Sequence, residues 1–230
     1  MGRYEVLFTD SACYYIKGTS LLLSKSAITK DNEKDAVLVQ LKFKTLYRKK
    51  IASLEVIISG MDLEGRTIEE KPFRYIDFDV SKYEEFGDRT PIYMDMNNVR
   101  KFNVRVSRII FSDGSVEIVD DGECIEVPEK PFPFDSNLRE QYVRTVGALG
   151  GAPKSICSPL KFGHFWKCSC GAINILDDEN CGACRCSSES IFCSLDENKL
   201  AIDLTEFKEQ QERKDEENKK SKPHSLKKQL

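Results

Sequence analysis

Apolar and polar residues alternate along several stretches of the first 128 residues, and this alternation predicts β-strands. Residues 37–45 show it most clearly, because one face of the expected strand is entirely apolar: Val37, Val39, Leu41 and Phe43. Residues 100–111 repeat the pattern, with an expected inward face of Phe102, Val104, Val106 and Ile110. A period of two is what a strand with one buried face produces.

Further strands are expected over residues 51–58 and 73–80, which are rich in β-branched and aromatic residues. Turn signals that contain Asp and Gly separate them at 62–65, 112–114 and 120–122. Seven or eight short strands at this spacing predict a mainly β fold, in which residues 1–128 form a two-sheet antiparallel β-sandwich. A partly closed barrel is the alternative.

Residues 129–162 are expected to be a linker that contains one short helix. The linker opens with the stiff segment 131–133, Pro-Phe-Pro. The helix is predicted over 136–146, with an apolar side that we expect to dock onto the sandwich or the metal module: Leu138, Tyr142, Val143 and Val146. Residues 147–159 are rich in Gly, Ala, Pro and Ser, which is typical of a flexible linker.

The final segment, residues 194–230, is expected to be a charged helical or disordered tail. Asp203 is a candidate helix cap, with Glu206 three residues later. Residues 208–225 contain no apolar residue except Pro223, so a helix there would have no face to bury. The stretch 219–228 is basic, and a solvated tail is the default interpretation.

The strongest chemical signal is a cluster of four closely spaced thiols: Cys168, Cys170, Cys181 and Cys184. Two close pairs joined by a short loop provide the tetrahedral thiolate set that Zn²⁺ prefers, so one structural zinc ion is predicted. Cys186 and His164 are near enough to replace one of the four ligands. Gly171 and Gly182 stand where tight turns around a metal often need a positive φ.

Trp166 and Asn174 complete the pattern W-K-C-S-C-G-A-I-N-(six residues)-C-G-A-C. Over residues 163–192 the chain resembles the Ran-binding-protein type of zinc finger and related bacterial zinc ribbons, and the ribbon is assigned to residues 163–193. The resemblance implies that the tryptophan packs beside the metal knuckle and that the asparagine braces a turn. Ubiquitin-binding members carry Thr-Phe where this chain has Gly171 and Ala172, so ubiquitin binding is not supported.

The first domain also has a resemblance, carried by VLVQLKFKTLYRKKIASLEVIISGMDLEGR, TPIYMD and IIFSDGS. Across about residues 13–120 it is similar to the sandwich domain of bacterial proteins that carry a zinc ribbon behind it, and to FxLYD-type sandwiches. The resemblance implies a fold and no established activity.

Composition narrows the class of partner. A net charge of −3 over 230 residues argues against a general nucleic-acid or anionic-membrane partner. The N-terminal residues lack an apolar signal core, and no apolar run is long enough to span a membrane. Five cysteines outside the cluster have no framework spacing, which favours reduced thiols and a cytoplasmic location: Cys13, Cys124, Cys157, Cys186 and Cys193.

An enzyme is not expected. The first 128 residues contain no histidine, which removes the commonest general base. Asp77 and Asp79 would lie on one face of the expected strand 73–80 and could imitate a catalytic pair, but two solvated acids are the simpler interpretation. Cys13 and Cys124 are interpreted as small core residues, and no small-molecule substrate is evident.

These features together predict a zinc-binding, non-enzymatic interaction or adaptor protein whose partner is a protein. The alternative is a nucleic-acid-associated protein that uses the finger and the basic tail. A zinc- or redox-responsive switch that uses Cys186 and Cys193 is a third class. Because the finger loop 175–179 reads Ile-Leu-Asp-Asp-Glu, it suits a protein surface better than phosphate. Ile175 and Leu176 could equally pack on Trp166.

Overall fold

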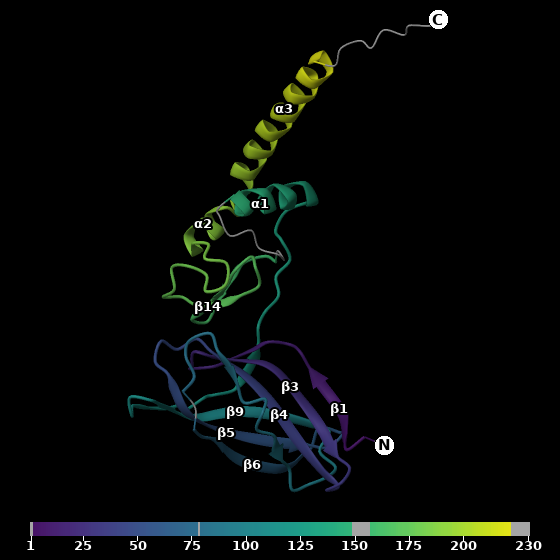
Figure 1. Cartoon of the computed structure of the whole chain (residues 1–230), viewed down its shortest axis with the longest axis vertical. Coiled ribbons are helices and arrows are strands. Elements are labelled where there is room, and N and C mark those ends of the chain that lie inside the picture. The colour runs from purple at the N-terminus through teal and green to yellow at the C-terminus, as the bar shows by residue number, and fades with distance from the viewer. Residues whose placement is uncertain (1, 78, 149–156, 222–230) are drawn as a thin grey trace, which may run out of the picture. The chain divides into compact units, whose positions relative to one another are not determined.

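The computed structural model describes residues 2–77, 79–148 and 157–221, and the chain forms two compact units, Met1–Pro128 and Glu129–Leu230 (Figure 1). Each unit buries its own hydrophobic residues and is considered by itself.

Two antiparallel sheets build the first unit. The larger sheet has the order β11-β2-β3-β4-β7, with β1 also on β3 and β8 also on β4. Its strands are β1 (Tyr4–Asp10), β2 (Tyr14–Ile16), β3 (Leu21–Asp31), β4 (Ala36–Thr45), β7 (Glu85–Phe86), β8 (Ile92–Tyr93) and β11 (Cys124–Glu126). The smaller sheet has the order β10-β9-β5-β6 and comprises β5 (Ile51–Met61), β6 (Thr67–Tyr75), β9 (Lys101–Phe111) and β10 (Val116–Ile118).

The predicted mainly β fold with an N-terminal two-sheet sandwich is therefore confirmed. The strands outnumber the seven or eight expected, because the additional ones are only two or three residues long. Such segments are too short for alternation to reveal them, and they form because their longer neighbours present backbone groups to pair with.

The core lies between the two sheets and follows the alternation in the sequence. The four residues expected on the inner face of 37–45 are all fully buried. From β5, the smaller sheet contributes Leu54, Val56 and Ile58. Close approach of the segment before β11 to β9 explains Gly122, where an added Cβ would lie 1.9 Å from the carbonyl oxygen of Val106.

The expectation that the Ile110 side chain points into the core is wrong. Glu55 pairs with Arg108 and Val56 pairs with Val106, so Ser107 is an extra residue that forms a β-bulge. The bulge reverses the inward face, and the core therefore receives fully buried Ile109, while Ile110 is half-buried.

The strand expected over 73–80 ends at Tyr75, so the expected placement of Asp77 and Asp79 on one face of that strand is wrong. Asp77 follows the strand with a φ of 62°, a left-handed conformation that no strand continues. Asp79 forms an ion pair with Lys50, which lowers the pKa of the Asp79 carboxyl.

The second unit consists of a small sheet and three helices. Its elements are α1 (Ser136–Ala148), β12 (Leu160–Phe162), β13 (Phe165–Lys167), β14 (Ile173–Ile175), α2 (Ser188–Cys193) and α3 (Glu197–Ser221). The sheet has the order β12-β13-β14, so it begins ahead of residue 163, where the sequence pattern placed the start of the ribbon. Most of the expected flexible linker 147–159 lies outside the described residues.

The helix predicted over 136–146 is present as α1, and the Asp135 carboxylate caps it by accepting a hydrogen bond from the Leu138 amide. Its apolar side packs on the beginning of α3 inside the second unit, where Tyr142 and Val146 share a cluster with Leu200. Val143, expected on the same side, is 37% exposed.

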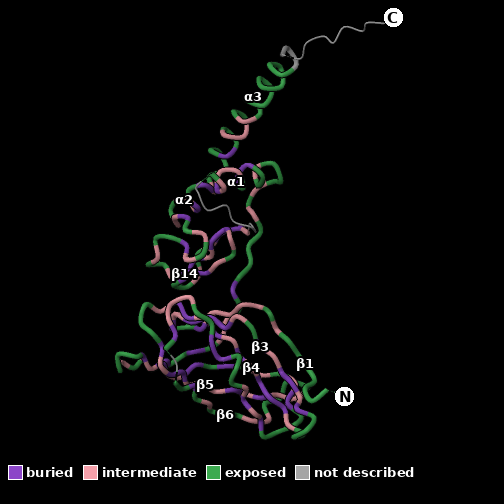
Figure 2. The backbone as a smooth tube through the Cα atoms, in the orientation of Figure 1, coloured by how far each residue is buried: buried purple, intermediate pink, exposed green. Residues whose placement is uncertain are grey.

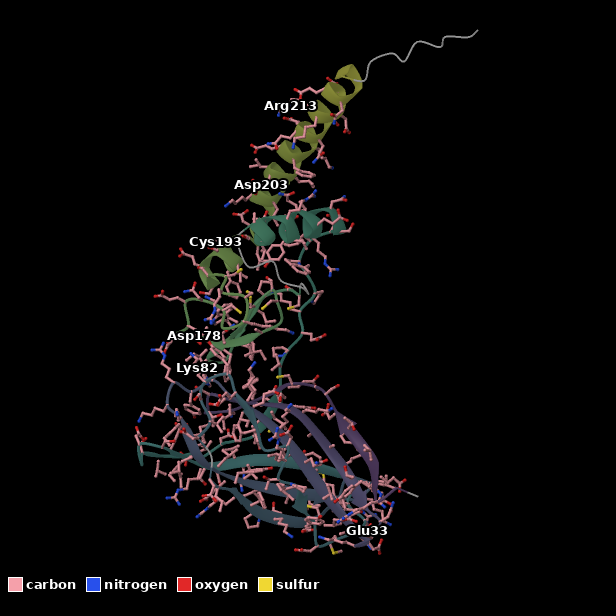
Figure 3. The ribbon with its side chains drawn as sticks, in the orientation of Figure 1. Glu33, Lys82, Asp178, Cys193, Asp203 and Arg213 are labelled. Atoms are coloured by element: carbon pink, nitrogen blue, oxygen red, sulfur yellow. The ribbon has the colours of Figure 1, made fainter. Side chains whose placement is uncertain are left out.

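The assignment of all residues after 193 to a tail is wrong for the first part of α3. Leu200 is 1% exposed and belongs to the α1 cluster, and the Arg144 guanidinium lies 3.9 Å from the Phe207 ring centre. Asp203 is not a cap, because α3 begins at Glu197 and Asp196 accepts the Lys199 amide. Figure 3 shows Asp203 within the helix.

From residue 208 to 218 every side chain of α3 is exposed, as its polar composition requires. Arg213 lies in this part of the helix (Figure 3). Among the described residues, no helix combines the length and apolar content that crossing a bilayer requires.

Candidate metal centre

The first thiol pair lies in the tight turn between β13 and β14. The amide of Cys168 donates to the Ala172 carbonyl at 2.8 Å, and the amide of Gly171 donates to the Cys168 carbonyl at 2.8 Å. Gly171 has a φ of 89°, which favours glycine, as the sequence predicted. This turn holds Cys168 and Cys170 on one side of the backbone.

The second thiol pair lies in a turn that begins at Cys181. The amide of Cys181 donates to the Cys186 carbonyl at 2.9 Å, and the amide of Arg185 donates to the Cys181 carbonyl at 3.0 Å. The left-handed residue here is Arg185, with a φ of 67°, so the expectation of a positive φ at Gly182 is wrong. The Gly182 amide instead donates a hydrogen bond to the Asn174 side chain.

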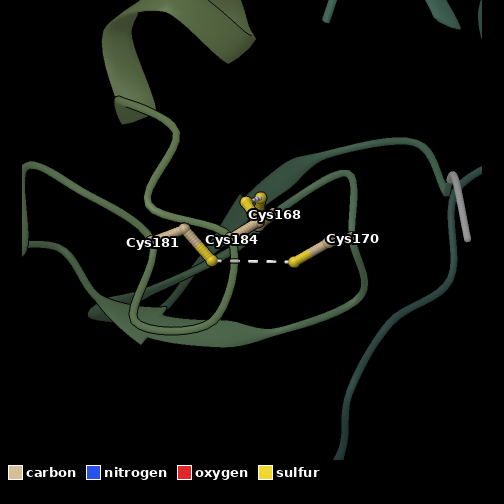
Figure 4. Close-up of side chains that lie close together, drawn as sticks. All are labelled: Cys168, Cys170, Cys181 and Cys184. Atoms are coloured by element: carbon tan, nitrogen blue, oxygen red, sulfur yellow. Dashed lines mark hydrogen bonds between the residues drawn. The ribbon is translucent and has the colours of Figure 1, made fainter. Parts of the chain in front are cut away.

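The four predicted ligand residues come together, and their sulfur atoms all lie within 4.8 Å of one another (Figure 4). The Cys168 and Cys184 sulfurs are 3.5 Å apart, and the Cys170 and Cys181 sulfurs are 3.6 Å apart. A tetrahedral zinc ion with bonds of about 2.3 Å to sulfur separates its ligands by about 3.8 Å. The cluster is therefore close enough to hold a metal ion of this kind.

Backbone amides surround the cluster and favour its ionised form. The sulfurs of Cys168, Cys170 and Cys181 each accept hydrogen bonds from amides two or three residues further along the chain. Hydrogen bonds from Cys168 and Cys170 hold the pKa of the Cys181 thiol below its usual range, whereas hydrogen bonds with Cys170 and Cys181 raise the pKa of Cys168. Four sulfurs this close can all be thiolates only if a cation neutralises them.

Asn174 connects the two turns. Its side chain is fully buried, its Oδ1 accepts the Gly182 amide at 2.9 Å, and its Nδ2 donates to the Ala172 carbonyl at 3.3 Å. One side chain thus fixes the spacing between the first and the second thiol pair.

Trp166 is 1% exposed and forms the apolar wall of the cluster. It shares a buried cluster with Cys168, Cys181 and Cys186, and its ring meets that of Phe192 at 6.2 Å. Its indole N–H donates to the Asp178 carbonyl at 3.1 Å, which attaches the loop 175–179 to the metal centre.

Neither substitute ligand joins the cluster among the described residues. Cys186 is 3% exposed and packs in the core beside Trp166, while its carbonyl supports the second turn. The His164 ring lies against the Phe165 ring, with centres 4.0 Å apart. Cys193, the other thiol proposed for a switch, is exposed at the end of α2.

The sequence pattern did not indicate that two further residues, Ser169 and Cys157, support the thiol turns. Ser169, between the first two ligands, is fully buried, and its hydroxyl hydrogen-bonds the hydroxyl of Tyr142 on α1. Cys157 donates its amide to the Ser169 carbonyl at 2.9 Å and its thiol to the Cys168 carbonyl at 3.3 Å. Nothing in the spacing of these residues indicates such contacts, because they join segments far apart in the chain.

The loop 175–179 has a half-buried and an exposed aliphatic side chain. Ile175 is half-buried in β14, and Leu176 is 45% exposed, while its amide donates to the His164 carbonyl at 2.9 Å. The side chains of 177–179 are acidic.

Comparison of the chain with protein-family models, curated proteins and solved structures gives no match. The resemblances to Ran-binding-type fingers and FxLYD-type sandwiches therefore stay predictions.

Proposed function

We propose that this chain is a zinc-binding, non-enzymatic interaction or adaptor protein, in which one structural zinc ion holds the ribbon that contacts a protein partner. The observation that carries the proposal is the closed set of four sulfurs, supported by backbone amides. Soft thiolate ligands select zinc over the oxygen-binding cations calcium and magnesium.

The closed ligand set supports a structural role for the metal. Catalytic zinc keeps one coordination position for water or substrate, whereas four protein thiolates occupy all four positions of a tetrahedral ion. Asn174 hydrogen-bonds both thiol turns, and Cys157 and Tyr142 hydrogen-bond the first. Zinc bound there would order the ribbon and the helix that rests on it.

The loop 175–179 supports a protein partner. It is attached at both ends, through the Leu176 amide and the Asp178 carbonyl, so Leu176 is presented on ordered backbone. A fixed aliphatic group beside three acids can pack on an apolar surface with a basic rim, whereas acids repel a phosphate backbone.

Metal analysis of the purified full-length protein tests the first half of the proposal. We expect one zinc per chain, which is lost in Cys168→Ser and retained in Cys193→Ser, whose exposed thiol is the matched control. Iron in place of zinc, or loss of metal only in Cys186→Ser, would overturn this assignment.

Binding measurements test the second half. Proteins captured by the wild type should be lost with Leu176→Asp and kept with Ile202→Asp, because Ile202 is an aliphatic residue of the same unit that is even more exposed, 60% against 45%. Titration with single-stranded RNA and DNA at two salt concentrations tests the alternative of nucleic-acid binding. Tight binding that falls steeply with salt would replace the adaptor proposal by a nucleic-acid-associated role.

A further inference from the structure

The edge strands of the sandwich are protected in different ways. Among the described residues, β7, β8, β10 and β11 are only two or three residues long, and β6 contains Pro72, which cannot donate to another strand. β1 is seven residues long and contains neither proline nor lysine. It is therefore the long edge strand of this part of the chain that has neither of these protections; a charged residue, Glu5, and a bulge at Leu7 remain, and Figure 2 shows the strand largely exposed.

Alternate residues of β1 direct their backbone groups away from the sheet. The Arg3 carbonyl accepts the Asn32 amide of the neighbouring chain segment at 2.8 Å, so Arg3 directs its backbone groups towards that side. Because this direction alternates along a strand, Tyr4 and Val6 direct their N–H and C=O groups towards the open edge. Their side chains are 54% and 64% exposed.

A cavity lies beside this edge, between the two sheets. Its volume is about 290 Å³, and β1 and β2 form one wall while the beginning of β9 forms the other. Its apolar lining includes Phe8, Leu23, Met61, Phe102 and Val104. In the described part of the chain, β10 pairs only with Arg108–Ile110 of β9. The first residues of β9 therefore pair with β5 on one side and with no strand on the other.

The open backbone groups of β1 and the neighbouring cavity together indicate what kind of segment would bind there. Outward N–H and C=O groups are complemented by an extended backbone, and a neighbouring apolar cavity is complemented by one apolar side chain. The charged residues of β1 are Glu5 and Asp10, both acidic, whereas Lys101 lines the cavity. Basic residues of the bound segment would therefore be favoured beside β1 but not inside the cavity.

A second copy of β1 fits less well. Val6 pairs with Thr29 and Phe8 pairs with Ile28, so a bulge at Leu7 places Val6 and Phe8 on opposite faces. Two antiparallel copies centred on Leu7 would set an outward Val6 against an inward Phe8, which breaks a regular ladder.

We propose that β1 binds an extended segment of a partner protein as an added strand, with one apolar side chain of that segment in the cavity beside Phe8. The segment is apolar at that position and polar or basic beside it. This rests on the adaptor role only in that the partner is a protein, and it does not involve the metal centre.

Selection of short random peptides displayed on phage against the full-length, zinc-loaded protein tests the proposal. We expect enrichment of sequences that alternate apolar with polar or basic residues, and a loss of affinity of at least about tenfold in both Val6→Lys and Phe8→Asp. Ile76→Lys is the matched control, because Ile76 is 57% exposed in the same unit and follows the end of β6 that pairs with Leu54, away from the cavity residue Met61. Failure to enrich any such sequence, or equal binding to all variants, would overturn it.

Hydrogen exchange of the selected complex gives an independent readout. An added strand must slow exchange of the Tyr4 and Val6 amides, whereas a ligand held by side chains alone would leave them unchanged and contradict the proposal. A dimer that Val6→Lys dissociates would instead make a second copy the occupant. Repeating the titration with Cys168→Ser separates the two proposals, because peptide affinity should persist when the ribbon has lost its metal.

Discussion

The two units of this chain bury different kinds of side chain. The sandwich encloses aliphatic and aromatic side chains from two sheets, whereas three of the five buried members of the ribbon cluster are cysteines. A large unit can bury enough apolar surface to be stable, whereas a small ribbon cannot, and a metal ion bound by the four thiols would supply the missing free energy. The comparison teaches that the same chain folds by two physical routes, which respond to different perturbations.

The largest expected effect is removal of the metal ligands. Cys181→Ser, or a chelator, should abolish metal binding and unfold the ribbon, since structural zinc contributes about 10–16 kcal/mol of apparent binding free energy. Trp166 is the single tryptophan of the chain and is 1% exposed, so its emission should shift to the red. Amide resonances of the sandwich should not move.

Cys193→Ser is the control for this experiment, because its thiol is exposed and lies outside the cluster. If chelation unfolded the sandwich together with the ribbon, the two units would share one folding transition and the comparison would fail.

The next effect is confined to the sandwich. Phe43 is fully buried, and its ring lies 6.0 Å from that of Tyr75 and 5.7 Å from that of Phe86. Phe43→Ala should lower the free energy of unfolding by about 3–5 kcal/mol in urea, with unchanged metal content. Leu63→Ala, at an exposed turn, should change it by less than about 0.5 kcal/mol. Loss of zinc in Phe43→Ala would contradict the independence of the units.

A smaller effect is expected inside the ribbon. Asn174→Ala would leave the Gly182 amide without its partner and remove one of the two hydrogen bonds that the Ala172 carbonyl accepts, at a cost of about 1–3 kcal/mol. The measurement is the rate at which a chelator removes zinc, which should increase while the stoichiometry is retained. Asn180→Ala, at an exposed position in the same loop region, should leave that rate unchanged.

The smallest effect concerns the contact between α1 and the first thiol turn. Tyr142→Phe removes the hydroxyl that bonds Ser169, and a double-mutant cycle with Ser169→Ala should give a coupling of about 1 kcal/mol. Additive effects of the two changes would show that the hydroxyls do not interact.

The same contact has a pH dependence. Burial raises the pKa of Tyr142 from 10.0 to about 12, so the folded unit holds this proton more tightly than the unfolded chain. The resulting stability is complete below pH 10 and is lost as the pH rises towards 12. Tyr142→Phe should remove this part of the alkaline loss.

Particular residues show how far the sequence reaches. The alternation in 37–45 predicted which side chains are buried, because a strand has a fixed period of two. The same reasoning failed at Ile110, since the extra residue Ser107 leaves no trace in the alternation. The length of α1 was predictable from local signals, but its packing partner Leu200 was not, because the apolar residues of α3 occupy only its first part and precede a long polar stretch.

By itself, the sequence determined the long alternating strands β4, β5 and β9 and the four thiols, because both depend on residue types at short, regular spacings. Only the tertiary structure decided that Ser107 forms a bulge, that Arg185 rather than Gly182 takes the left-handed turn, and that Tyr142 reaches Ser169. It also left β1 as a long edge strand of the described sandwich without proline or lysine. These features depend on which distant segments meet in space, and pairing between distant segments is not encoded in any local pattern.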